Sequence, residues 1–490
     1  MNYRMILYLL GVVLLLIGGF LLLPCMVALI YAETQGWDIL LTVGICLVSG
    51  TLLALLKPKK KRGVHARDGF VMVSLSWILI SLVGALPFYL SGAIESYLDA
   101  VFETVSGFTT TGASILSNVE AMPKCLLFWR SFTHWLGGMG VLVFMLAIVP
   151  MSGDSIFLLK AESPGPSVSK MVPKMRTTAM ILYGIYLAMT VLQYLLYRVG
   201  VWFGWGEMPI FDSICLTFGT AGTGGFSVRA DGLASYSMYE QGLTTVFMIL
   251  FGVNFSIYFF ILCKKFKLVW QNSELKAYIG IILTAITLIA VNLIRTGGYF
   301  DSIGDAVHYS AFSVSSVITT TGYGTVDFAL WPEFSKVILL LLMVSGACAG
   351  STGGGAKVSR LLILFKFARS EVRHLIHPRQ VEVITMDKKR VSNDVIRGTT
   401  AYLIVYVGVM ALSILLVSID GFGMETSISS VFATLNNIGP GVSSVVGPFG
   451  GFGGFSPLSK IVMSVCMLFG RLELFPMLLL LRPSTWKKHG

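Results

Sequence analysis

ITTTGYGT, at Ile318–Thr325, combines small hydroxyl side chains with two glycines and lies between two apolar stretches. A central glycine allows backbone angles that place successive carbonyl oxygens on one side of a loop. Three related loops read FTTTGAS at Phe108–Ser114, GTAGTGGFS at Gly219–Ser227 and LNNIGPG at Leu435–Gly441. One such loop would be weak evidence, but four at similar spacing predict an internal repeat that defines the fold.

The surroundings of the four loops are also alike. Each loop follows a long apolar segment and a shorter, semi-apolar helix, and another apolar segment comes after it. An acidic residue lies near the start of each short helix, where a carboxylate complements the positive end of the helix dipole. Ordinary capping is the favoured role of these acids, rather than direct ligation of an ion: Asp99, Asp212, Asp305 and Glu425.

The composition is that of a membrane protein. Hydrophobic residues make up 55% of the 490 positions and charged residues only 12%, whereas soluble domains carry about 25% charged residues. Several apolar runs are near or above the roughly 20 residues that cross a bilayer, among them Tyr8–Ile30, Ile39–Leu56, Phe70–Leu90 and Tyr402–Ile419. An N-terminal hairpin and four units of two spans predict ten crossings.

The net charge of +11 reports topology rather than nucleic-acid binding. Most Lys and Arg residues lie in alternate polar segments, and the segments between them, which carry the loops, are weakly charged. By the positive-inside rule the basic segments face the cytoplasm, so both termini are expected there. Anionic lipid is the default partner of such segments.

The loops therefore have to re-enter the membrane from the outer side. Non-helical backbone at that depth is tolerated where it lines a wet cavity, and the negative ends of four converging short helices stabilise a cation. Rings of carbonyl oxygens can then replace the water around an ion. We predict an all-α polytopic membrane protein with four repeats of span, pore loop and span around one central pore, as in potassium channels, plus the two-helix hairpin.

The expected organisation follows from these repeats. Residues 1–66 form the hairpin, and the four pore repeats occupy residues 67–175, 176–272, 273–392 and 393–490, with an intramembrane loop in the third repeat.

Several longer motifs resemble the Trk/Ktr/HKT superfamily of potassium transporters, and most closely its bacterial TrkH type, over essentially the whole chain. They are SGFTTTGAS, TTTGYGT, ATLNNIGPG, WRSFTHWLGGMGV at Trp129–Val141, FGVNFS at Phe251–Ser256 and SGACAGSTGGGAKVSR at Ser345–Arg360. The extra hairpin favours the TrkH type over the shorter Ktr subunits. The resemblance implies potassium uptake across a bacterial cytoplasmic (inner) membrane, with potassium as substrate and no cofactor in this chain.

The resemblance also implies a selectivity filter in which Gly112, Gly224, Gly322 and Gly439 are the equivalent central glycines. Glycine in all four loops goes with potassium preference, and serine in the first with sodium permeation. The second and fourth loops depart from a potassium-channel sequence, so a four-fold symmetric filter is not expected. The expected ion-binding residues are Thr110, Thr111, Gly112, Gly222, Thr223, Gly224, Thr320, Thr321, Gly322, Asn437, Ile438 and Gly439.

The segment Gly346–Gly355 interrupts an apolar span. It misses the spacing of a phosphate-binding loop by one residue and follows no strand. A flexible break beneath the filter, able to plug the pore, is the favoured interpretation, and a kink for close helix packing is the alternative. The resemblance implies a gating loop, with the gating residues Gly346, Ala347, Gly350, Ser351, Thr352, Gly353, Gly354, Gly355, Lys357 and Arg471.

Arg471 has no acid three or four positions away that would pair with it on a helix, and an ionisable residue in a span is functional by default. We expect it to line the conduction path just inside the filter, where its charge limits ion dwell or blocks sodium. Pairing with a neighbouring helix or snorkelling is the alternative. For His134 and His308 a pH-sensing role is conceivable, but packing is favoured.

Other functions fit less well. A membrane enzyme would need a motif such as H-E-x-x-H or G-x-S-x-G, and neither occurs. An inverted-repeat carrier conflicts with loops that all enter from one side. Within the same fold, a proton- or sodium-coupled symporter and a non-selective sodium/potassium permease remain alternatives.

The resemblance further implies a homodimer and a separate TrkA-like cytosolic subunit that binds nucleotides and controls the gate. The basic segments Lys57–Arg67 and Lys366–Arg397 are the expected docking surfaces for it, and lipid headgroups explain them almost as well.

Overall fold

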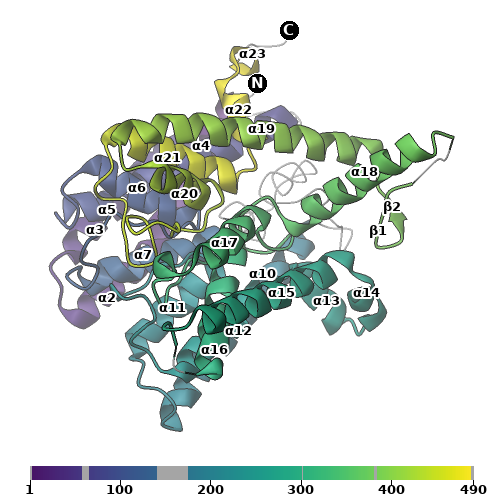
Figure 1. The fold of residues 1–490 in the computed structure, drawn as a ribbon. Helices are drawn as coiled ribbons and strands as arrows, with labels where there is room; N and C mark the ends of the chain where they lie inside the picture. The colour runs from purple at the N-terminus through teal and green to yellow at the C-terminus, as the bar shows by residue number, and fades with distance from the viewer. Residues whose placement is uncertain (1–2, 58–65, 141–174, 301, 380–382, 487–490) are drawn as a thin grey trace.

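The computed structural model describes residues 3–57, 66–140, 175–300, 302–379 and 383–486. In these ranges the regular secondary structure is almost entirely helical (Figure 1), and its two strands, β1 (Thr385–Met386) and β2 (Lys389–Arg390), form one small antiparallel hairpin.

The N-terminal hairpin consists of α1 (Tyr3–Phe20), α2 (Leu22–Tyr31) and α3 (Gly36–Ala54). Helices α1 and α3 pack side by side. Glycines make this close approach possible, because a Cβ at Gly11 would lie 2.7 Å from the carbonyl oxygen of Gly50. The predicted hairpin is confirmed.

Four units follow, each with a long first helix, a short helix and a second helix (Figure 1). Their bounds are α4 (Ala66–Gly84), α6 (Tyr97–Phe108) and α7 (Lys124–Gly138); α10 (Met175–Trp202), α11 (Ile210–Gly222) and α12 (Met238–Phe251); α15 (Ser273–Thr296), α16 (Ile303–Ile318) and α17 (Glu333–Ser345); and α19 (Asn393–Val417), α20 (Met424–Leu435) and α21 (Pro457–Arg471). The remaining described helices are α5 (Leu86–Leu90), α13 (Phe255–Leu262), α14 (Phe266–Gln271), η1 (Phe328–Leu330), α18 (Val358–Ile376), η2 (Ser418–Asp420), α22 (Phe475–Leu481) and α23 (Pro483–Trp486). The four short helices α6, α11, α16 and α20 precede the four loops, as predicted.

The second helix of every repeat is short. Helices α7, α12, α17 and α21 have 15, 14, 13 and 15 residues, which at about 1.5 Å per residue falls short of a hydrocarbon core of about 30 Å. Within the described ranges six helices are long and apolar enough to cross a membrane, or seven if α12 and α13 count as one span bent by 89°. The number of crossings, ten by the sequence pattern, stays a prediction.

The breaks have local causes. Helix α12 ends before Gly252 and α17 before Gly346, which has a φ of +64°. Helix α21 ends where Glu473 and Leu474 both adopt positive φ. Left-handed backbone cannot continue a right-handed helix, which ends α17 and α21, whereas Gly252 after α12 keeps a right-handed φ of −74°.

The repeats close into a ring in chain order. The second helix of one repeat packs against the short helix of the next, in the pairs α7 with α11, α12 with α16, α17 with α20 and α21 with α6. In Figure 1 the last repeat, drawn in yellow, returns to the blue α6 of the first. This arrangement brings the four loops to one centre.

Polar contacts at the starts of the short helices join neighbouring repeats. Lys460 Nζ lies 2.7 Å from a carboxylate oxygen of Asp99, and Lys336 Nζ lies 3.2 Å from one of Glu425. Each lysine is the fourth residue of its second helix, and at the same place in α12 Gln241 contacts His308 at 2.9 Å. Two of the expected capping acids thus also bind the repeat before them.

Candidate functional site

The four loops share one backbone conformation. In each, a non-glycine residue with φ between +53° and +59° is followed two positions later by a glycine with φ between +78° and +95°. The residue between them donates its N–H to the carbonyl five positions earlier at 2.8–2.9 Å. The corresponding triplets are Thr110–Thr111–Gly112, Thr223–Gly224–Gly225, Thr320–Thr321–Gly322 and Asn437–Ile438–Gly439.

This correspondence corrects the predicted register of the second loop. Gly225, and not Gly224, is equivalent to Gly112, Gly322 and Gly439. Gly222 still belongs to α11, so the equivalent segment is Thr223–Gly225 instead of Gly222–Gly224. The second loop contains several glycines, and only their backbone angles show which one takes the strained position.

The four central glycines lie directly against neighbouring loops. A Cβ added at Gly112 would collide with the carbonyl oxygen of Gly224, and one at Gly225 with that of Thr321. The same holds for Gly322 with Ile438 and for Gly439 with Thr111, the largest of the four separations being 2.7 Å. The contacts run from the first loop to the second, third and fourth and back to the first, so the loops form a closed ring.

The backbone of the ring repeats in all four loops, although their sequences differ. The four loops are alike in these backbone angles, and a filter without four-fold symmetry stays a prediction. Glycine and left-handed backbone determine the path of each loop, whereas the side chains at the middle position differ: Thr111, Gly224, Thr321 and Ile438.

A pocket open to solvent lies on one side of the ring. Its lining includes all four central glycines, together with Arg130 and Arg229.

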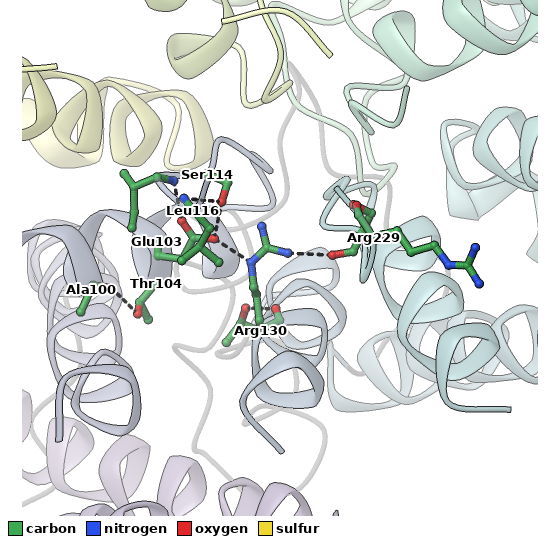
Figure 2. Close-up of polar contacts among 10 residues, drawn as sticks. Ala100, Glu103, Thr104, Ser114, Leu116, Arg130 and Arg229 are labelled. Carbon is green, nitrogen blue, oxygen red and sulfur yellow. Dashed lines mark hydrogen bonds and ion pairs between the residues drawn. The ribbon is translucent and has the colours of Figure 1, made fainter. Parts of the chain in front are cut away.

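Behind the first loop lies a buried ion pair that sequence reasoning missed (Figure 2). Arg130 Nε is 2.6 Å from Glu103 Oε1, and the two residues are 3% and 1% exposed. Glu103 also accepts bonds from Ser114 Oγ and the N–H of Ile115, both at 2.9 Å. Because Arg130 Nη1 donates to the carbonyl of Ser227 at 2.9 Å, the pair joins the first loop to the second. In the sequence, the only signal of this ion pair was the presence of two charged residues of opposite sign within apolar helices.

The predicted break between α17 and α18 is confirmed, and it lies against the inner ends of two loops. The N–H of Gly354 donates to Thr320 Oγ1 at 2.6 Å. A Cβ at Gly353 would lie 2.8 Å from the carbonyl oxygen of Thr319, and one at Gly354 would collide with that of Asn436. Residues Gly346–Lys357 are called the intramembrane loop below.

The ends of the broken second helices converge on the intramembrane loop. The N–H of Cys348 donates to the carbonyl of Gly252 at 3.1 Å, and the N–H of Phe255 donates to that of Gly350 at 3.0 Å. Thr352 Oγ1 donates to the carbonyl of Phe251 at 3.2 Å. The intramembrane loop is therefore held by the α12–α13 corner as well as by the filter loops.

Arg471, at the end of α21, completes this arrangement. Its guanidinium donates to the carbonyls of Thr352, at 2.9 Å, and Gly138, at 2.8 Å. The same side chain also bonds the carbonyl of Gly137, so a cation lies at the negative end of the α7 dipole. Arg471 is thus next to the intramembrane loop, and its effect on ions stays a prediction.

Three further charged residues hold the intramembrane loop. Lys357, buried and with a φ of +76°, donates from Nζ to the carbonyl of Gly353. Glu274 Oε1 accepts from the N–H groups of Ala349 and Ser359 at 2.7 and 3.1 Å. Arg360, just after the loop, donates to the carbonyl of Ala356 at 3.3 Å and pairs with Glu473. Sequence reasoning included Lys357 but gave no role to Glu274, which lies far away in the chain.

The two histidines are in packed surroundings. His134 is fully buried behind the second loop, and its ring centroid is 4.1 Å from that of Phe226. His308 bonds Gln241 across a repeat boundary. These contacts agree with the favoured packing roles.

Several known proteins resemble this chain in sequence and in fold. A family model described as TrkH, cation transport protein, matches residues 36–488. The chain is 34% identical to the Trk system potassium uptake protein TrkH of Salmonella typhimurium and to that of Escherichia coli K12, over 100% of each chain. It is 32% identical to the crystal structure of the potassium transporter TrkH from Vibrio parahaemolyticus, with a TM-score of 0.89, covering 99% of this chain and 100% of the other.

Proposed function

Because this chain belongs to the TrkH family of cation transport proteins, we propose that it carries potassium ions into the cell through the ring of four loops. The family is one of transporters, so the chain is not an enzyme. The relatives named above are potassium uptake proteins. The observation that carries the proposal is the closed ring itself, in which every central glycine abuts a carbonyl of the next loop.

The ring supports selective conduction for a simple physical reason. Carbonyl oxygens around an axis replace the water of a partly dehydrated cation, and the short helices point their negative ends toward the same centre. The filter carbonyls then come from Thr110–Gly112, Thr223–Gly225, Thr320–Gly322 and Asn437–Gly439. Inward flow follows the membrane potential, worth about 2.3 kcal/mol per charge per 100 mV.

The intramembrane loop acts as the gate in this proposal. It contacts the inner ends of the third and fourth filter loops, so an ion leaving the filter meets it first. Opening requires the loop to leave its contacts with Thr320 and Arg471.

The proposed setting is a bacterial cytoplasmic membrane, with both termini inside and with anionic lipid beside the basic segments. The printed names of the relatives refer to a Trk system. A homodimer and a TrkA-like nucleotide-binding subunit on the cytoplasmic face are the partners that we propose.

The test is rubidium uptake into proteoliposomes that contain the purified chain, under an imposed inside-negative potential and with sodium as competitor. We expect uptake that resists sodium, and loss of that resistance in Gly112→Ser. Gly408→Ser is the matched control, because a Cβ at this helical glycine meets open space. Equal rubidium and sodium fluxes in the unmodified chain and in Gly112→Ser would contradict the filter.

A further inference from the structure

The four filter loops are braced in different ways. In the first loop Thr111 Oγ1 is 2.8 Å from Thr109 Oγ1, and in the third Thr321 Oγ1 is 2.7 Å from Thr319 Oγ1. In the fourth loop Asn437 Nδ2 donates to Thr111 Oγ1 and to the carbonyl of Met467, both at 2.9 Å.

The second loop lacks the pair of hydroxyl groups that braces the first and third loops. Its residues equivalent to Thr109 and Thr111 are Gly222 and Gly224, which have no side chains. A loop with glycine at these positions has more conformational freedom to lose than its three partners. Side chains from outside the second loop therefore have to hold its carbonyl oxygens in the ring.

The imidazole of His134 occupies the space of the missing side chain. A Cβ added at Gly224 would overlap Nδ1 of His134, and Cγ and Cε1 of the same ring would also collide with it. Gly224 itself has no positive φ, so its backbone would accept a threonine if the imidazole were not there. Within the described part of the chain neither ring nitrogen has a hydrogen-bond partner, so the ring acts by its shape.

Arg130, one helical turn before His134 on α7, holds the next residues of the same loop. Its Cζ lies 3.5 Å from the ring centroid of Phe226, a ring that His134 also contacts. Its guanidinium bonds the carbonyl of Ser227. Residues Gly224 to Ser227 thus rest on two side chains of a single α7 face.

Glu103 offsets the cost of burying the charge of Arg130 in a membrane interior. A buried unpaired arginine would be costly, and the 2.6 Å contact with Glu103 balances its charge. Glu103 comes from α6, the short helix of the first loop. The position of the second loop is thereby tied to that of the first.

We propose that His134 and Arg130 are positioning residues for ion selectivity, which replace the missing brace of the second filter loop. The proposal rests on the proposed filter function and adds to it the residues that set the geometry of one quarter of the ring. Carbonyls that move by a few tenths of an ångström no longer distinguish potassium from the smaller sodium ion, so loss of the brace lowers selectivity before it abolishes flux.

The test is a double-mutant cycle between Gly224 and His134, read as the ratio of rubidium to sodium uptake in proteoliposomes. Gly224→Thr alone collides with the imidazole, and His134→Ala alone frees the loop, so each lowers the ratio by about tenfold or more. The combination fills the space of the removed imidazole with a threonine side chain, as at Thr111 and Thr321, and returns the ratio to within about threefold of the unmodified chain. A combination no better than Gly224→Thr would overturn the proposal.

A second pair of variants keeps the test decisive if Gly224→Thr does not fold. His134→Phe preserves a planar ring and should keep the ratio, whereas His134→Ala should lose it. Equal ratios in both variants would refute a role based on shape. Gly112→Ser is measured beside them. If this variant leaves the ratio unchanged, the filter residues are wrongly assigned. If it is the only variant that lowers the ratio, the filter assignment holds and the proposed role of His134 is refuted.

Discussion

At the scale of single residues, the ring depends on four glycines that combine two requirements. Each has a φ between +78° and +95°, which costs roughly 1–2 kcal/mol for most other residues. Each also faces a neighbouring carbonyl oxygen that a Cβ would meet. A small shift is enough to meet either requirement alone, but the two together leave no room for a side chain without moving an ion-facing carbonyl.

The alignment of the second loop with the other three can be tested at Gly225. Gly225→Ser should lower the ratio of rubidium to sodium uptake about as strongly as Gly112→Ser, by tenfold or more, because both glycines contact the next loop in the same way. The ratio is measured from paired tracer fluxes in one proteoliposome preparation. Full selectivity in Gly225→Ser would show that the second loop is aligned wrongly.

Arg471 carries a second prediction at this scale. Arg471→Gln removes the cation that bonds the carbonyls of Thr352, Gly137 and Gly138. The intramembrane loop should then open more often, and rubidium flux at fixed potential should rise several-fold. Arg482→Gln, at an exposed arginine beyond α22, is the control. An unchanged rate and selectivity in Arg471→Gln would leave this arginine without a role in conduction.

Sequence patterns could locate the four loops but could not give the register of the second, because consecutive glycines look alike until their φ angles are known. They also could not reveal Arg130, Glu103 and His134 as neighbours of the second loop. These residues come from α6 and α7, and only the folded ring brings them behind Gly224 and Phe226. Contacts between distant segments leave no local signature.

At the scale of elements, the intramembrane loop is where the broken helices and the filter meet. Its glycines made the break after α17 predictable, since small residues interrupt an apolar run. The break after α21 was not predictable, because Glu473 and Leu474 carry no mark of positive φ in the sequence. The same holds for the short second helices, whose apolar composition alone resembles that of complete spans.

The hydrogen bond from Gly354 to Thr320 gives a prediction for this element. Thr320→Val keeps the size of the side chain but removes the acceptor, so the intramembrane loop should detach more readily and rubidium flux should rise. Thr110→Val is the matched control, because Thr110 has the same place in the first loop and bonds only its neighbouring carbonyl among the described contacts. The two initial rates are compared at equal protein content. A rise of equal size in both variants would argue against a specific latch.

At the scale of the whole molecule, the ring must be closed between the fourth repeat and the first. The periodicity of loops and basic segments predicted four repeats around a centre, and the packing of α21 against α6 agrees with this. Their order around the centre came only from the structure, since the sequence does not say which second helix meets which short helix. The pairs Lys460–Asp99 and Lys336–Glu425 mark two of these boundaries.

Closure of the ring can be tested through stability. Lys460→Met removes a partly buried charged hydrogen bond and should cost about 2 kcal/mol, seen as a lower Tm of the purified protein in detergent. The reversed pair Lys460→Asp with Asp99→Lys should recover part of the loss. Lys267→Met, at an exposed lysine of α14, is the control. A Tm unchanged by Lys460→Met would mean that this boundary does not depend on the pair.

The most direct measurement of the central claim is the anomalous diffraction signal of rubidium in crystals of this protein. We expect peaks on the axis of the ring, among the carbonyl oxygens of Thr111, Gly224, Thr321 and Ile438, and their weakening in Gly112→Ser. Rubidium peaks elsewhere in the protein, with the ring empty in crystals that are saturated with the ion, would contradict the account.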